Sequence, residues 1–118
     1  MNRKGTRHPI IFTSERLQQA AMQENTPHSQ LVESVTLARA ALLARRGKLK
    51  QAETLLLPLA NRSQSRASIL DLLAKVYAQQ GKIEEAKALW LRASQIEPSN
   101  AHFRRALLRC TNLQRHKS

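Results

Sequence analysis

Residues 47–53 read Gly47-Lys48-Leu49-Lys50-Gln51-Ala52-Glu53, and residues 81–87, 34 positions later, read Gly81-Lys82-Ile83-Glu84-Glu85-Ala86-Lys87. The glycine, the lysine after it, the branched aliphatic residue and the alanine recur in the same order. A fixed period of this length in helix-favouring sequence indicates an array of helical hairpins, because one hairpin cannot bury its apolar face until a neighbour stacks on it. The repeat therefore predicts an all-α fold of stacked antiparallel hairpins.

The second unit, residues 67–100, divides into two predicted helices on either side of Gly81. Apolar residues at i, i+3, i+4 and i+7 mark the inner side of the first helix: Leu70, Leu73, Ala74 and Tyr77. Gly81 stands where that helix should end, since glycine takes the left-handed conformation that closes a last turn. The second helix is expected to start near Lys82 and to end at Glu97-Pro98. Its inner face is predicted to carry Ile83, Ala86, Trp90 and Ala93.

These residues resemble the signature of the tetratricopeptide repeat family. In the unit 67–100 the matching positions are Leu70, Leu73, Ala74, Tyr77, Gly81, Ala86, Trp90, Ala93 and Pro98. The preceding unit, residues 33–66, matches less closely and is interpreted as a degenerate repeat that keeps Ala40, Leu43, Gly47, Leu49, Ala52 and Leu56. The resemblance implies a short solenoid of about five helices whose usual function is to bind another protein.

Helix boundaries in the rest of the chain follow from proline and capping residues. Thr26-Pro27 predicts the start of a helix that runs to about Arg46, and Pro58 is expected to kink or end its own helix near Leu57. Ser99 or Asn100 can cap a fifth helix, which the resemblance makes a capping helix over residues 100–114. Its predicted apolar stripe is Phe103, Leu107 and Cys110, with Ala106 and Leu113 on the flank. The helical domain is thus placed at 26–118, after a basic tail at 1–25 in which 14–23 are a candidate short helix and 1–12 are expected to be disordered.

The charge balance predicts a negatively charged partner. Twenty Lys and Arg stand against eight Asp and Glu, a net charge of +12, and the stretch 39–50 contains five basic residues and no acid. In the register that the resemblance gives, the first helix of each hairpin and the capping helix would line a concave groove. The residues of this predicted groove face are Leu37, Ala41 and Arg45, then Asp71, Lys75 and Gln79, then His102, Arg105, Arg109 and Asn112.

Two kinds of partner fit such a surface. An acidic segment of another protein could lie in the groove, with Lys75, Arg105 and Arg109 supplying charge and Leu37 and Ala41 an apolar contact. Nucleic acid is the alternative, since phosphate contacts need little beyond clustered Lys and Arg, although the chain has only four aromatic residues for base stacking. The clamp with which some tetratricopeptide repeats hold a terminal carboxylate is incomplete, because Leu37 and Ala41 replace its first pair.

The sequence offers no pattern for catalysis, a cofactor or a metal. The four histidines are scattered, and the lone Cys110 falls on an apolar stripe, where a buried thiol is expected. No membrane-spanning stretch or signal peptide is present, which predicts a soluble cytoplasmic protein. Surplus apolar residues in the degenerate repeat predict a homodimer or an obligate complex through the N-terminal half: Leu31, Val35, Leu55 and Leu59.

Overall fold

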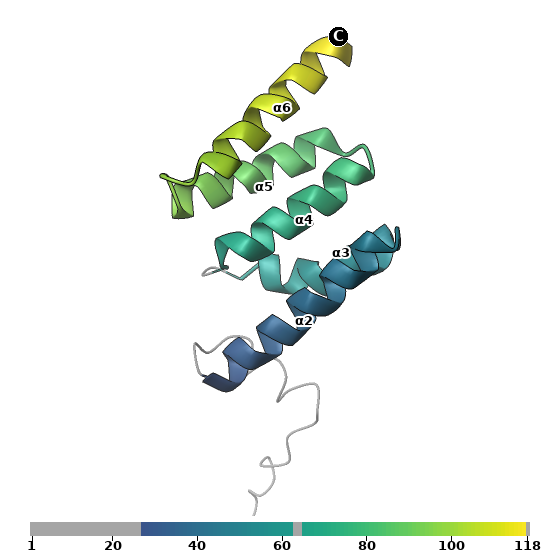
Figure 1. Cartoon of the computed structure of the whole chain (residues 1–118), viewed down its shortest axis with the longest axis vertical. Coiled ribbons are helices and arrows are strands. Elements are labelled where there is room, and N and C mark those ends of the chain that lie inside the picture. The colour runs from purple at the N-terminus through teal and green to yellow at the C-terminus, as the bar shows by residue number, and fades with distance from the viewer. Residues whose placement is uncertain (1–26, 63–64, 118) are drawn as a thin grey trace, which may run out of the picture. The chain divides into compact units, whose positions relative to one another are not determined.

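The computed structural model describes residues 27–62 and 65–117, and the side chains up to residue 115. Within this part the secondary structure is five α-helices and the turns between them (Figure 1). They are α2 (Pro27–Arg45), α3 (Leu49–Ala60), α4 (Ala67–Gln79), α5 (Ile83–Ile96) and α6 (Ala101–Lys117). The chain divides into two compact units, Met1–Ser34 and Val35–Ser118, each taken by itself below. The predictions for the tail 1–25 and for Thr26 lie outside the described residues.

Both predicted glycine turns are confirmed, and they have the same conformation. Gly47 has φ +78° and Gly81 has φ +82°, the left-handed region in which a side chain is strained. Each turn closes its helix with a Schellman pair of hydrogen bonds. After α2, the amides of Gly47 and Lys48 donate to the carbonyls of Ala44 and Leu43 at 3.0 and 2.9 Å. After α4, the equivalent bonds run from Gly81 to Ala78 and from Lys82 to Tyr77 at the same two distances.

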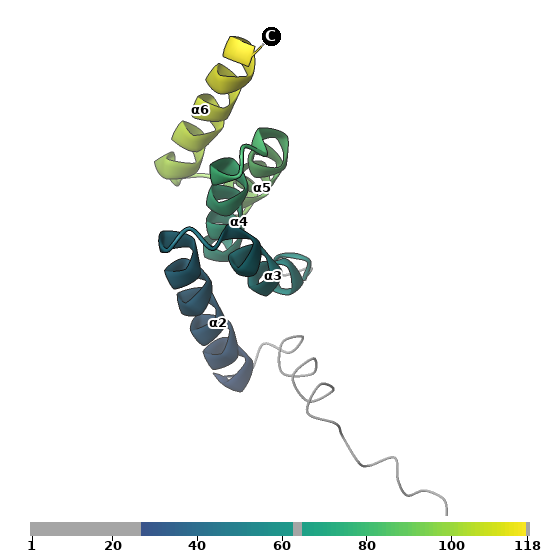
Figure 2. The same cartoon turned by 90° about the vertical axis from the view of Figure 1, so that its right-hand side faces the viewer.

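The unit Val35–Ser118 has its core where α3, α4, α5 and α6 pack in sequence order, as both views show (Figure 1, Figure 2). α4 is apolar on the two sides that meet α3 and α5, so Ile69, Leu70, Leu73, Ala74 and Val76 are all buried. From α5, the predicted residues Ala86, Trp90 and Ala93 are buried, and Trp90 is only 4% exposed. The predicted core of the second repeat is therefore confirmed, with Tyr77 and Ile83 at its half-buried edge.

Pro58 was expected to kink or end its helix near Leu57; the end is wrong, because α3 continues through Pro58 to Ala60, and the kink stays a prediction. Pro58 lies in the last turn, where little helix remains to be disrupted. The carboxyl end of α3 also has partners from outside the helix. The Ser65 hydroxyl lies 2.7 Å from the Leu59 carbonyl oxygen, and the Arg92 guanidinium of α5 donates to the Ala60 carbonyl at 3.2 Å. These contacts stabilise the carbonyl groups that a helix end leaves without internal donors.

Two other expectations about apolar residues need correction. Leu59, predicted as surplus surface, is fully buried, because α3 extends far enough to carry it into the core. Leu113, predicted on the apolar flank of the last helix, is 49% exposed. The helix itself begins as predicted, since Asn100 Oδ1 accepts a hydrogen bond from the His102 amide at 3.0 Å. Phe103, Ala106 and Cys110 form its buried side, so α6 covers α5 while its other side meets solvent.

Helix α2 differs from the other four. The extensive contacts among described helices join α3 to α4, α4 to α5 and α5 to α6, and α2 takes part in none of them. In its first eight residues Ser29 and Glu33 are buried and Leu31 is 62% exposed. In the remainder Ala40 is fully buried, whereas Val35 and Leu42 are 52% and 39% exposed. The predicted surplus apolar surface is confirmed at Leu31 and Val35, whereas Leu55 of α3 is half-buried; exposed Leu42 was not among the predicted residues.

Candidate functional site

The predicted groove face divides into three rows, one on each of α2, α4 and α6. On α6, Arg105, Arg109 and Asn112 are all exposed. They are four and three residues apart, so they share one side of the helix, and buried Phe103 lies on the other side. On α4, Lys75 and Gln79 are exposed and Asp71 is largely covered. On α2, Leu37 and Ala41 are half-buried and Arg45 is exposed. This row therefore offers a partly exposed apolar surface next to a positive charge.

Asp71 brings the α4 and α6 rows together. Its side chain is 16% exposed and one carboxylate oxygen accepts a hydrogen bond from the Trp90 indole N–H at 2.8 Å. The same oxygen lies 3.1 Å from Nε2 of His102, which donates to it when that nitrogen carries the proton. The other oxygen pairs with Lys75 Nζ at 3.1 Å. One carboxylate therefore ties α4, α5 and α6 to each other, a role that the sequence analysis did not assign to it.

This arrangement changes the expected charge of the site. The sequence analysis counted Lys75 with Arg105 and Arg109 as three cations, but the ion pair to Asp71 neutralises Lys75. Arg105 and Arg109 form no hydrogen bond or ion pair within the residues that the structure describes. Helix α6 contains no Asp or Glu, so their charge is not balanced from within the helix either. The unpaired charge of the α4 and α6 rows is concentrated on these two arginines.

The α2 row is not joined to the other two by any contact comparable to the one between Asp71 and His102. Leu37, Ala41 and Arg45 follow one another along α2 at intervals of four residues, as the register requires. The structure thus brings together the α4 and α6 rows and leaves the α2 row as a separate strip of the predicted face.

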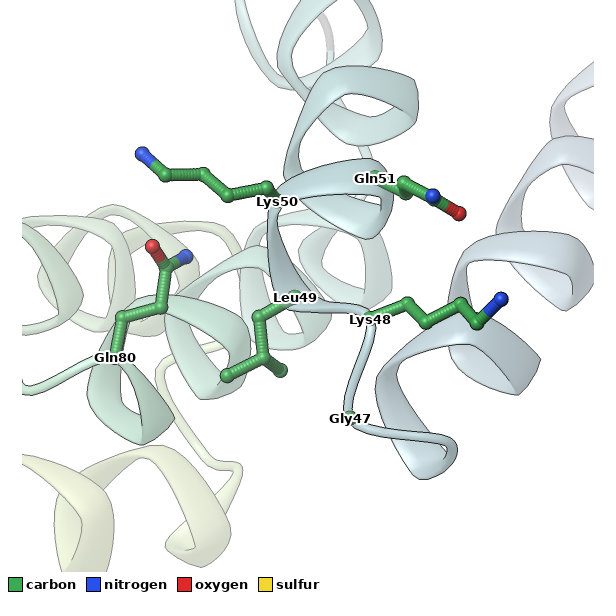
Figure 3. Close-up of a pocket in the computed structure, with 6 residues that line it drawn as sticks. All are labelled: Gly47, Lys48, Leu49, Lys50, Gln51 and Gln80. Atoms are coloured by element: carbon green, nitrogen blue, oxygen red, sulfur yellow. The ribbon is translucent and has the colours of Figure 1, made fainter.

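A pocket of about 440 Å³ lies beside the first glycine turn, away from the predicted rows (Figure 3). Its lining is Gly47, Lys48, Leu49, Lys50, Gln51 and Gln80. In Figure 3 Leu49 lies between two pairs of polar side chains, with Lys50 and Gln80 on one side and Lys48 and Gln51 on the other. Sequence reasoning noted the two lysines and missed the pocket, because Gln80 reaches it from the turn after α4.

The second glycine turn has the same backbone but balanced charge. Gln80 donates to Glu53 Oε1 at 3.0 Å, and Lys82 Nζ lies 4.0 Å from the same oxygen and 5.6 Å from the centre of the Tyr77 ring. Burial raises the pKa of Tyr77, and the Glu53 carboxylate raises it further. These contacts link α3 to the end of α4, so Glu53, Gln80 and Lys82 have a structural role.

The described residues contain no cluster of metal-ligating side chains, and their one cysteine is buried. Among them no three His, Cys, Asp or Glu side chains gather closely enough to hold a metal ion. Cys110 is 2% exposed, as predicted, and burial raises the pKa of its thiol, which Arg109 and Lys87 offset only in part. A thiol that stays protonated is a poor nucleophile. None of the described helices is both long enough and apolar enough to cross a membrane.

Comparison with known proteins identifies the repeats. The geometry defines an α-helical repeat protein, with two hairpins closed by equivalent glycine turns and a final helix packed on the second hairpin. Residues 34–58 and 67–92 match the family model described as Tetratricopeptide repeat. These two segments of the chain are tetratricopeptide repeats, and such repeats form protein–protein interaction modules that are typically non-enzymatic. No curated protein and no solved structure matches the chain.

Proposed function

We propose that this protein is a small adaptor or chaperone that holds an acidic segment of a partner protein on the face formed by α4 and α6. The observation that carries the proposal is the pair Arg105 and Arg109. Both side chains are exposed, they stand one helical turn apart, and neither has a counter-ion in the described part of the chain. The guanidinium group binds carboxylates through two parallel hydrogen bonds, so two such groups at this spacing suit carboxylates on one segment.

Packing fixes the direction in which these arginines point. Phe103, Ala106 and Cys110 hold the opposite side of α6 in the core, with exposures of 3%, 0% and 2%. The link from His102 to Asp71 holds the first turn of α6 against α4. A partner therefore meets two arginines on an ordered helix, and less conformational entropy is lost on binding than for side chains on a flexible loop.

The other residues of the predicted face take lesser parts in the proposal. Lys75 lies on the proposed binding face but adds little net positive charge, since Asp71 already neutralises it. Gln79 and Asn112, both exposed, offer amide groups to the backbone of the segment. Leu37 and Ala41 supply an apolar contact and Arg45 a further cation, if the segment is long enough to reach α2. The proposal sets the protein in the cytoplasm, where the single cysteine is kept reduced.

Nucleic acid is the alternative partner, and the aromatic residues argue against it. Sequence-tolerant binding of a single strand depends on exposed aromatic rings on which bases stack. Trp90 and Phe103 are 4% and 3% exposed, and Tyr77 is half-buried beneath Lys82. The described aromatic rings are therefore occupied in packing, which favours a protein partner.

Pull-down from the native source with the Arg105→Glu/Arg109→Glu variant tests the proposal. The matched control is Lys48→Glu/Lys50→Glu, which changes the net charge by the same amount on exposed residues of the first turn. All samples are treated with nuclease, and circular dichroism checks the fold. We expect the first variant to keep its helicity and lose the partner, while the control keeps both. Equal retention by the two variants, or a partner that disappears on nuclease treatment, would overturn the proposal.

A further inference from the structure

One side of α2 carries an apolar stripe that remains exposed in the structure. Val35, Ala38 and Leu42 follow the spacing i, i+3, i+7, so they lie along one side of the helix. All three are exposed, Val35 by 52% and Leu42 by 39%. Ala40, on the opposite side, is fully buried, which fixes the orientation of the helix. We refer to Val35, Ala38 and Leu42 as the α2 stripe.

Such a stripe has the geometry of a helix–helix seam. Apolar residues that alternate at three and four positions are what one helix presents to another in a coiled-coil contact. The first helix of a solenoid also normally carries a polar outer face, because no further repeat stacks on it. Among the described helices α2 comes first in the chain, its Val35 and Leu42 are exposed, and the described helices give it no extensive contact.

Arginines border the α2 stripe along one flank and at its carboxyl end. Arg39 and Arg46 lie four residues after Val35 and Leu42, on that flank, and Arg45, seven residues after Ala38, continues the line of the stripe. Arg46 keeps helical geometry, since its amide donates to the Leu42 carbonyl at 3.1 Å. None of the three forms an ion pair within the described residues, and residues 35–50 contain no Asp or Glu. The seam is therefore apolar at its centre and positive along one edge and at its carboxyl end.

We infer that the α2 stripe docks an amphipathic helix of a partner protein whose apolar side is flanked by Asp or Glu. Charge decides between this occupant and a second copy of the chain. In an antiparallel pair of α2 helices, Arg39 and Arg46 would face the same residues of the other copy, and two chains of +12 repel each other as a whole. An acidic flank converts that repulsion into attraction. This surface is separate from Arg105 and Arg109 and does not depend on the function proposed for them.

A designed peptide serves as the probe. It is a labelled helix of three heptads with Leu at positions a and d and Glu at e and g, and fluorescence anisotropy measures its binding to the whole chain. A second peptide with Lys in place of Glu tests the charge. We expect the Glu peptide to bind more tightly than the Lys peptide by about tenfold or more.

Three double variants separate the contributions. Val35→Asn/Leu42→Asn should weaken the Glu peptide by about tenfold or more, because each apolar side chain that is lost weakens the seam. Leu91→Asn/Ile96→Asn removes two apolar residues of α5 that are at least about as exposed and should leave binding unchanged. Arg39→Glu/Arg46→Glu should reverse the preference in favour of the Lys peptide.

Several outcomes would overturn the inference. Equal binding of the two peptides would show that charge plays no part, and loss of binding in the α5 control would show that the contact is unspecific. A stable dimer in light scattering that Val35→Asn/Leu42→Asn converts to a monomer would make the occupant a second copy. The Arg105→Glu/Arg109→Glu variant should bind the peptide normally, so failure here is distinguishable from failure of the proposed function.

Discussion

Replacing Asp71 with alanine should destabilise the protein far more than its charge alone suggests. The carboxylate accepts the indole N–H of Trp90 at 2.8 Å, and Trp90 is only 4% exposed. Without Asp71 this buried donor has no acceptor, which costs about 1–3 kcal/mol. The ion pair with the half-exposed Lys75 adds little, since exposed pairs contribute about 0–1 kcal/mol. We expect the free energy of unfolding to fall by about 1–3 kcal/mol in total.

Urea unfolding followed by the helical circular dichroism signal measures this change, because Trp90 is the one tryptophan in the chain and one of the controls replaces it. Two controls assign the effect. Lys75→Met, which removes only the ion pair, should change stability by less than about 0.5 kcal/mol. Trp90→Phe removes the donor, so adding Asp71→Ala to it should cost less than Asp71→Ala does in the wild type. An Asp71→Ala variant as stable as the wild type would refute the reasoning, and so would a Lys75→Met variant that loses as much stability.

Three further predictions concern the turns, the core and the pH dependence. Gly81→Val should cost more than about 1 kcal/mol, through backbone strain at φ +82° and not through a clash, since no atom lies within 4 Å of an added Cβ; an unchanged melting temperature in calorimetry would count against it. Trp90→Ala should cost about 3–5 kcal/mol and unfold much of a marginally stable domain, and a cooperative, wild-type-like transition would contradict the core assignment. Burial raises the pKa of the Cys110 thiol in the folded state, so the thiol of the unfolded state loses its proton at a lower pH. The contribution of Cys110 to the free energy of unfolding should therefore be full below about pH 8.5 and fall as the pH rises above it. Urea titrations at pH 7 and pH 9.5 should show a smaller loss of stability between the two pH values for Cys110→Ala than for the wild type.

The second repeat could be predicted closely because its interactions are local. The turn at Gly81 closes α4 through bonds from Gly81 to Ala78 and from Lys82 to Tyr77, and the apolar residues of α4 and α5 follow the helical period. Both features are visible in a single stretch of sequence. The same holds for the start of α6, where Asn100 caps the helix that follows it. In these segments the propensity of the chain and its packing agree.

The interactions that the sequence did not reveal join distant residues. Asp71 contacts residues 19 and 31 positions away, and no helical period relates it to either Trp90 or His102. The extension of α3 past Pro58 is accompanied by contacts from Ser65 and from Arg92, 32 positions beyond Ala60. Helical spacing identifies which side chains share a face of one helix, but it does not show contacts between helices. The ion pair of Lys75 is a different case, because Asp71 lies only four residues earlier on the same helix; that spacing was visible in the sequence, and counting Lys75 as a free cation overlooked it.

A photo-crosslinking experiment tests the central claim, that the protein binds a protein segment on the face of α4 and α6. A photoreactive amino acid is placed in cells at Asn112, on that face beside Arg109, or at Gln95, an exposed position on α5, as the control. The account predicts that Asn112 gives a nuclease-resistant adduct with an acidic segment of one protein, and that Gln95 does not. Adducts of equal yield from both positions, or an adduct from Asn112 that contains only nucleic acid, would contradict it.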